Sequence, residues 1–178
     1  MYIFKPMLLA SPSKSHTMRA LFFALIARGK STITNYLDSP DTDRMIDAMR
    51  ALGGGVNKHL DYIDVKGVGG KLISTKQIID AGNSGLVFRF VTGLSALMDS
   101  YTVITGDESI CHRRPIKALL NALESAKAFA KSSLNDDYAP VIIRGPIKAG
   151  EYEIEGRDSQ PVSSFLMVLS LLSEKSIV

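Results

Sequence analysis

Three mostly apolar stretches recur along the chain, each after a turn of small and polar residues. They centre on residues 20–27, 88–94 and 165–169 and hold Phe, Leu, Ile, Val, Met or Ala at most positions. A helix that is apolar on nearly all sides must be surrounded by other elements. The pattern therefore predicts three helices in the interior of the protein.

Strand-forming residues and a second, amphipathic helix follow each of the first two apolar helices. The strands are expected at residues 31–36 and 101–105. The amphipathic helices are expected from a turn at residues 38–41 to about Leu52, and from Pro115 onward in "PIKALLNALESAKAF". Three alternating stretches bounded by Gly or Pro, "LDYIDVKG", "APVIIRG" and "EYEIEG", add further strands.

The whole order of elements returns after 70 to 75 residues. Such a period indicates a repeated supersecondary unit, here roughly strand, helix, strand, helix, strand, strand. We expect an α+β fold of repeated βαβαββ units at about residues 11–80, 81–150 and 151–178. The apolar helices should lie inside, and the sheets and amphipathic helices outside. The third unit stops after its first helix, so we expect a single truncated domain, residues 1–178.

Composition argues against several classes of protein. The net charge is only +3 and no block of Lys or Arg occurs, so no nucleic-acid partner is expected. No apolar run approaches the ~18 residues of a membrane span, and a basic turn stands where a signal peptide would be cleaved. The single cysteine fits a reducing compartment. The three histidines lack metal-ligand spacing. We expect a cytoplasmic protein without metal or membrane contact.

Positive charge at the mouths of the apolar helices points to an anionic ligand. "SPSKSHTMRAL" places Lys14 and Ser15 in the turn before the first helix and Arg19 in its second turn, where free backbone N–H groups also attract anions. "AGNSGLVFR" opens the second helix with Asn83 and Gly85, and a glycine lets a ligand approach the backbone closely. At both places, a capped helix with solvated side chains is the alternative.

Two further stretches carry the same type of signal. "CHRRPIKALL" sets Arg113 and Arg114 before Pro115 at an expected helix start, where cations are unfavourable unless an anion is present. "DSQPVSS" places Ser159 and Gln160 at the start of the third apolar helix. A solvated arginine pair and an ordinary helix cap are the alternatives. If the helices of the three units start at one end of the domain, these groups form one anion-binding cup.

Together these stretches resemble the motifs of the EPSP synthase family (5-enolpyruvylshikimate-3-phosphate synthases), the shikimate-pathway enzymes inhibited by glyphosate. "SPSKSHTMRAL" is similar to "PGSKSxxxRAL", "AGNSGLVFR" to "LGNAGTAMR", "RRPI" to "ERPI" and "DSQPVSSFLM" to "SSQFLxALLM". The related UDP-N-acetylglucosamine enolpyruvyl transferases have Lys-Asn where this chain has Lys14-Ser15.

The resemblance implies an enolpyruvyl transferase-like domain and its reaction. The enolpyruvyl group of phosphoenolpyruvate passes to the 5-hydroxyl of shikimate 3-phosphate and phosphate is released, without metal or cofactor. Lys14 would be the catalytic residue of this chain, and Arg89 would serve structure. The implied contacts of shikimate 3-phosphate are Lys14, Ser15, Arg19, Ser159 and Gln160. The implied contacts of phosphoenolpyruvate are Lys14, Asn83, Gly85, Arg114 and Gln160.

Two departures from the family bear on these expectations. Asp158 stands where the family has a serine at the phosphate site, and a carboxylate there repels phosphate unless it turns away. The family's enzymes are also well over twice as long, with a C-terminal domain that supplies the acid–base carboxylates. We therefore expect a monomeric chain with half of an active site, no turnover by itself and a missing domain as its partner. A non-catalytic module that binds shikimate 3-phosphate is the alternative.

Overall fold

The computed structural model describes residues 10–178 and shows the first repeat unit as two helices on an antiparallel sheet. Its elements are α1 (Lys14–Ile26), β1 (Lys30–Thr34), α2 (Pro40–Ala51), β2 (Gly55–Lys58) and β3 (Tyr62–Lys66). β3 lies between β1 and β2 and runs antiparallel to both. The predicted order of elements is confirmed from α1 onward. The strand expected before α1 falls outside the described residues.

The second unit repeats this arrangement around a sheet ordered β4-β5-β7-β6, in which β4 is parallel to β5 and the other pairs are antiparallel. Its elements are β4 (Ile79–Asp80), α3 (Gly85–Ser95), β5 (Thr102–Thr105), α4 (Glu108–Arg113), α5 (Lys117–Ser125), β6 (Phe129–Ser132) and β7 (Val141–Arg144). The order β5-β7-β6 matches β1-β3-β2 of the first unit. The short helix α4 was not predicted, because its polar sequence resembles a loop.

The third unit contributes α6 (Ser159–Leu169) but not the strand expected over "EYEIEG". Only Glu151 forms a parallel bridge, with Ile177. The backbone N–H of Tyr152 donates to the Ile177 carbonyl, and that of Ile177 to the Gly150 carbonyl, both at 2.9 Å. This is the same parallel relation as between β4 and β5. The predicted strand is wrong because a ladder needs successive partners, and among the described residues Ile177 alone provides one.

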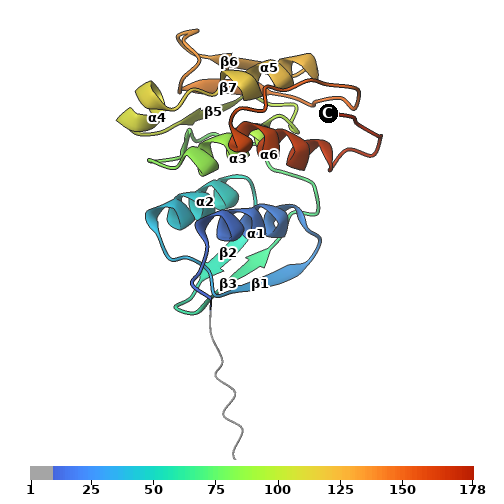
Figure 1. Ribbon diagram of the computed structural model, residues 1–178. Helices are drawn as coiled ribbons and strands as arrows, with labels where there is room; N and C mark the ends of the chain where they lie inside the picture. Colours follow the sequence, from blue (N-terminus) through green and yellow to red (C-terminus); the bar gives the residue numbers. More distant parts are fainter. Residues whose placement is uncertain (1–9) are drawn as a thin grey trace, which may run out of the picture.

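The helices α1, α2, α3 and α6 occupy the middle of the molecule, between the two sheets (Figure 1). α1 and α2 pack against the three-stranded sheet, while α3 contacts β5 and β7 of the four-stranded sheet and also α1, α2, α5 and α6. Every residue of α3 is buried. Its Phe90 ring meets the Phe22 ring of α1 edge to face, with centroids 5.7 Å apart, a favourable aromatic geometry. The core thus runs through the helices, as predicted.

The prediction that all three apolar helices are enclosed holds completely only for α3. Phe23 of α1 is 47% exposed and Leu166 of α6 is 45% exposed. α1 packs against α2, α3 and the first sheet, and α6 packs against α3 and α5. Among the described residues no third sheet covers the remaining faces of α1 and α6. Two of the three apolar helices are therefore half enclosed.

Equivalent glycines join sheet and helix in the two complete units. Gly67 follows β3 and Gly145 follows β7. A Cβ at Gly67 would overlap the carbonyl oxygen of Ala27, the residue that ends α1, and a Cβ at Gly145 would overlap that of Ala96, which ends α3. Only glycine allows the strand to approach the helix end so closely.

Replacing the first of these glycines is expected to destabilise the protein. In Gly67→Ala the new methyl group must displace a backbone carbonyl, which should lower the free energy of unfolding by about 2–3 kcal/mol. Gly156→Ala is the matched control, because a Cβ there meets nothing within 4 Å. Urea unfolding of both variants measures the difference. Equal stability of the two variants would show that the chain can adjust freely at Gly67.

Candidate anion-binding site at three helix starts

Lys14 stands at the very start of α1. The Ser13 hydroxyl accepts the His16 backbone N–H and so caps the helix, which makes Lys14 the first helical residue. The expectation that Lys14 lies in a turn before the helix is therefore wrong by one position. Its ammonium lies 3.7 Å from a carboxylate oxygen of Asp41 in the first turn of α2. Lys14 and Ser15 are both exposed.

Arg19 lies where α1, α3 and α6 meet. One guanidinium nitrogen donates to the Ser15 carbonyl at 3.2 Å, and the other donates to the Ser163 hydroxyl of α6 at 3.1 Å. The guanidinium carbon lies 5.7 Å from the centre of the Phe90 ring of α3, within cation–π range. These contacts hold the charge of Arg19 between all three apolar helices, and none of them neutralises it.

The start of α3 is joined to the end of α4. The Ser84 hydroxyl caps α3 by accepting the Val87 N–H. Asn83, just before it, donates from its amide to Asp107 at 2.8 Å and offers its amide oxygen to Arg114 at 3.5 Å. A Cβ at Gly85 would come within 3.3 Å of the Arg114 side chain. The structure therefore brings Asn83, Gly85 and Arg114 together.

The sequence predicted that Arg113 and Arg114 lie before a helix that starts at Pro115, and this prediction is wrong. α5 begins at Lys117, so Pro115 is not its first residue, and Arg113 and Arg114 instead end α4. Cations are favourable at the C-terminal end of a helix. Arg113 is well exposed and 4.0 Å from Glu108. Only Arg114 points toward the start of α3.

Asp158 caps α6, and its carboxylate is turned toward groups of the protein. Its Oδ1 accepts the Gln160 backbone N–H at 3.0 Å, and its Oδ2 lies 3.4 Å from the Arg89 guanidinium. The carboxylate that departs from the family pattern thus has two partners within the protein. Ser159 is the first residue of α6 and is exposed, so its hydroxyl remains accessible to a ligand.

Arg89 is the buried connection between α3, α6 and the segment after α4. It is 5% exposed. Its guanidinium donates to the Gly85 carbonyl at 3.1 Å, the Gln160 side-chain oxygen at 3.2 Å and the Pro115 carbonyl at 2.9 Å. Burial lowers the pKa of Arg89, Asp158 opposes this change, and the nearby positive charge of Arg114 adds to it. These contacts agree with the structural role expected for Arg89.

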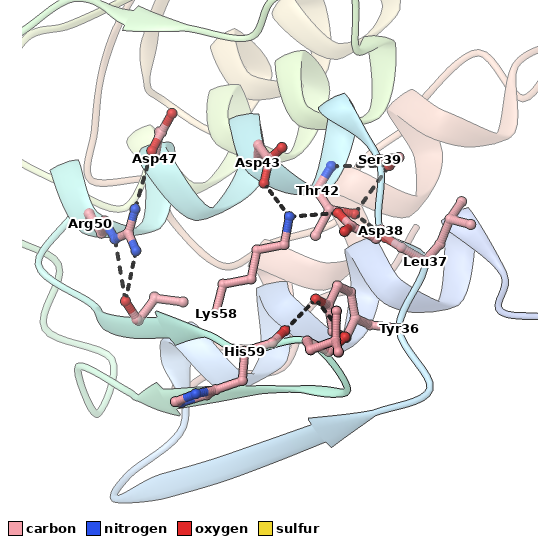
Figure 2. A network of polar contacts seen from close by, with 12 residues as sticks. Tyr36, Leu37, Asp38, Ser39, Thr42, Asp43, Asp47, Arg50, Lys58 and His59 are labelled. Atoms are coloured by element: carbon pink, nitrogen blue, oxygen red, sulfur yellow. Dashed lines mark hydrogen bonds and ion pairs between the residues drawn. The ribbon is translucent and has the colours of Figure 1, made fainter.

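A network of polar contacts fixes the start of α2 (Figure 2). This helix start carries Asp41, the ion-pair partner of Lys14. The Lys58 ammonium lies 2.6 Å from Asp38 and 2.7 Å from Asp43, on either side of the helix start, and these hydrogen bonds raise its pKa far above the usual range. The Ser39 hydroxyl caps α2 by accepting the Thr42 N–H. β2 is therefore tied to the turn that positions Asp41.

The predicted site residues fall into two groups. In the first, Arg19 of α1 contacts Ser163 of α6. In the second, Arg89 joins Gln160 of α6 to the start of α3, where Asn83 and Arg114 lie. Lys14 is linked to the second group less directly: its partner Asp41 and the side chain of Asn83 line one hollow of about 250 Å³. Within residues 10–178, no hydrogen bond joins the side chain of Ser15 or Ser159 to the other predicted residues; Ser15 meets Arg19 through its backbone carbonyl only.

Sequence reasoning missed two residues that complete this arrangement, Asp41 and Asp107. Their signals were local, because each is a carboxylate in the first turn of a helix or just before one. The sequence singled out Ser163 as one of the hydroxyls near the start of α6, but not its contact with Arg19. Such residues are ordinarily caps, so only the folded chain shows which of them meet a cation or an amide. In residues 10–178 no cluster of three metal-ligating side chains occurs, and no helix there has the length and apolarity to cross a membrane.

Comparison with known proteins identifies the class of protein to which this fold belongs. The family described as "EPSP synthase (3-phosphoshikimate 1-carboxyvinyltransferase)" matches residues 6–178. EPSP synthase from Acinetobacter baumannii superposes with a TM-score of 0.82 at 25% identity, covering 90% of this chain and 37% of that one. The fold is that of the enolpyruvyl transferases, as expected from the sequence. The chain belongs to the EPSP synthase family.

Curated relatives in this family are similar over most of this chain but much longer. The 3-phosphoshikimate 1-carboxyvinyltransferase of Chlamydia caviae is 41% identical over 90% of this chain and 36% of its own length. That of Acetivibrio thermocellus is 43% identical over 87% of this chain and 36% of its own length. The chain thus spans about a third of the length of the relatives that it matches.

Replacing Arg89 by lysine is expected to weaken the attachment of α6 to α3 and so to destabilise the protein. In Arg89→Lys, a single ammonium cannot reach the partners on α6 and Pro115 together, so the free energy of unfolding should fall by about 2–3 kcal/mol. Arg113→Lys, on an exposed side chain, should change it by less than about 0.5 kcal/mol. Chemical denaturation compares the two variants. Equal stability would mean that the contacts of Arg89 contribute nothing net.

The Lys58 network should contribute modestly and in a salt-dependent way. Both carboxylates are more than half exposed, so we expect Lys58→Met to cost only about 1 kcal/mol, with a smaller cost in about 0.5 M salt. Because hydrogen bonds to the two carboxylates raise the pKa of Lys58, this contribution persists in alkaline solution up to lysine's ordinary pKa of about 10.5 and declines as pH rises further. Lys66→Met on β3 is the control. A cost that grows with salt would contradict the electrostatic origin.

Proposed function

We propose that this chain forms the shikimate 3-phosphate and phosphoenolpyruvate contacts of one half of a 3-phosphoshikimate 1-carboxyvinyltransferase. The reaction transfers the enolpyruvyl group of phosphoenolpyruvate to the 5-hydroxyl of shikimate 3-phosphate. The observation that carries the proposal is the joining of α1, α3 and α6 at their starts through Arg19 and Arg89. This gathers cationic side chains around backbone N–H groups that themselves favour anions.

The two groups of site residues suit the two anionic substrates. At the starts of α1 and α6, the exposed Lys14, Ser15 and Ser159 are proposed to offer an ammonium and two hydroxyls to a phosphorylated ring, together with Arg19. At the start of α3, the absence of a side chain at Gly85 lets Arg114 approach the helix, and Asn83 lies beside this arginine. This pair is proposed to receive the smaller phosphoenolpyruvate. Gln160 lies between the groups, held by Arg89. Lys14 is the residue proposed to contact both substrates.

The remaining catalytic groups are proposed to come from a further domain that closes over this one. The exposed positions of Lys14, Ser15 and Ser159 are those of one wall of a cleft. A bound phosphoenolpyruvate would have protein on one side only, so its affinity for this chain alone should be low. By itself the chain is expected to release no phosphate from a mixture of the two substrates. We also propose a monomer that acts in the cytoplasm.

Calorimetric titration with shikimate 3-phosphate tests the proposal. The unmodified chain should bind, and Lys14→Ala combined with Arg19→Ala should weaken binding at least about tenfold, since two charge-assisted contacts to an anion are lost. Lys66→Ala with Arg113→Ala removes the same charge elsewhere and should leave the affinity unchanged. Equal loss in both double variants would reduce the effect to net charge and contradict the assigned site.

A second titration separates the enzyme from a simple binding module. An enzyme half should bind phosphoenolpyruvate more tightly once shikimate 3-phosphate is present, because the two ligands share Lys14 and Gln160. A module that only holds shikimate 3-phosphate has no reason to respond to phosphoenolpyruvate. Absence of any phosphoenolpyruvate response, with or without the first ligand, would favour the non-catalytic alternative.

A further inference from the structure

Asp107 uses both oxygens of its carboxylate to join two segments of the site. Its Oδ1 accepts the backbone N–H of Ile110 at 3.2 Å and caps α4. Its Oδ2 accepts the side-chain amide of Asn83 at 2.8 Å. The Asp107 backbone N–H also donates to the Gly82 carbonyl at 2.9 Å. One residue therefore fixes the start of α4 against the loop that precedes α3.

The contact with Asp107 decides which way the Asn83 amide faces. An ionised carboxylate only accepts hydrogen bonds, so the NH₂ group of Asn83 must face Asp107. The amide oxygen is then turned to the opposite side, where an Arg114 nitrogen lies 3.5 Å away. Rotating the amide by half a turn would set NH₂ against the Arg114 guanidinium, donor against donor. Asp107 thereby selects the orientation that Arg114 needs.

The same residue also controls where Arg114 stands. α4 spans only Glu108–Arg113, and Arg114 is the residue that ends it. Helices this short have little stability of their own, so a cap contributes a large share of it. Losing the cap would free the segment that carries Arg114. Asp107 acts on Arg114 twice, through the helix and through the amide.

We propose that Asp107 is the positioning residue of the phosphoenolpyruvate subsite. It holds Asn83 and Arg114 in one arrangement without touching the ligand itself. The inference rests on the proposed function only in naming the anion. The two contacts of Asp107 are properties of the folded chain, and they are tested with and without ligand.

The ligand-free test follows the Asn83 side-chain amide by NMR in the ¹⁵N-labelled chain. Asp107→Ser keeps an oxygen that can cap α4 but is too short to reach Asn83. We expect the Asn83 amide signals to move to the range of solvated amides, while backbone signals of α4 remain helical. Asp99→Ser, in an exposed pair with Arg144, is the control and should leave both unchanged. Unchanged Asn83 signals in Asp107→Ser would overturn the proposal.

An exchange of the two side chains gives a rescue. Asp107→Asn sets two NH₂ groups against each other, and Asn83→Asp sets two carboxylates against each other. Combining both substitutions restores one donor facing one acceptor, with the amide oxygen at position 107 still free to cap α4. The double variant should recover most of the stability lost in each single variant. Additive losses would overturn the coupling between the two residues.

Titration with phosphoenolpyruvate, in the presence of shikimate 3-phosphate, supplies the functional readout. Asp107→Ser should weaken phosphoenolpyruvate binding roughly tenfold, the size expected for one misplaced charge-assisted contact. Shikimate 3-phosphate alone should bind as before, because its contacts lie at α1 and α6. An equal loss for both ligands would mean general damage and overturn a specific positioning role.

The outcomes separate this inference from the proposed function. If the unmodified chain gives no response to phosphoenolpyruvate, the subsite assignment fails. The NMR and exchange experiments then decide alone whether Asp107 orients Asn83. If phosphoenolpyruvate binds and Asp107→Ser binds it equally well, the proposed function stands and the positioning role is wrong.

Discussion

The burial of one guanidinium group constrains everything else in this structure. A charge as enclosed as that of Arg89 is very unfavourable unless hydrogen-bond acceptors and an opposite charge meet it. The acceptors come from α3 itself, from α6 and from Pro115, and the most distant of them in sequence, Gln160, lies 71 residues from Arg89. Any displacement of α6 along α3 would leave this charge unpaired. The starts of the two helices are therefore locked at a fixed offset.

The cations near Arg89 differ in whether a carboxylate faces them. Lys14 and Arg89 each face a carboxylate, from Asp41 and Asp158 respectively. Arg19 and Arg114 are held instead by neutral oxygens, and no ion pair to either occurs within residues 10–178. Neutral partners orient an arginine without cancelling its charge. Arg19 and Arg114 therefore keep a positive charge that no carboxylate within residues 10–178 pairs with.

Much of this organisation was predictable from the order of residues. The apolar runs and the repeat period predicted the fold class and, apart from α4, the order of helices and strands in the first two units, because burial follows directly from such patterns. "EYEIEG" failed because strand formation depends on a partner that sequence alternation does not reveal. α4 was missed because its cap, Asp107, and its polar residues are also typical of a loop.

The site was predictable in its residue types and less so in its contacts. The sequence proposed Lys14, Arg19, Asn83, Gly85 and Gln160 as site residues because they lie at the starts of apolar helices. The helix boundary used in the argument for Arg114 is wrong, since Pro115 is compatible with a linker as well as with a helix start, although the structure does set Arg114 beside Asn83. Partners such as Asp41 and Ser163 depend on distances across the fold, which local patterns do not contain.

The contact of Gly67 and Gly145 with the ends of α1 and α3 has a consequence at the opposite end of each helix. A helix transmits a shift along its axis almost without loss, and the 11 residues of α3 reach about 16 Å. The distance between each glycine and the C-terminal end of its helix therefore also determines the position of that helix's N-terminus. Gly67 and Gly145, at the C-terminal ends of α1 and α3, therefore help to set where along their axes these two helices begin.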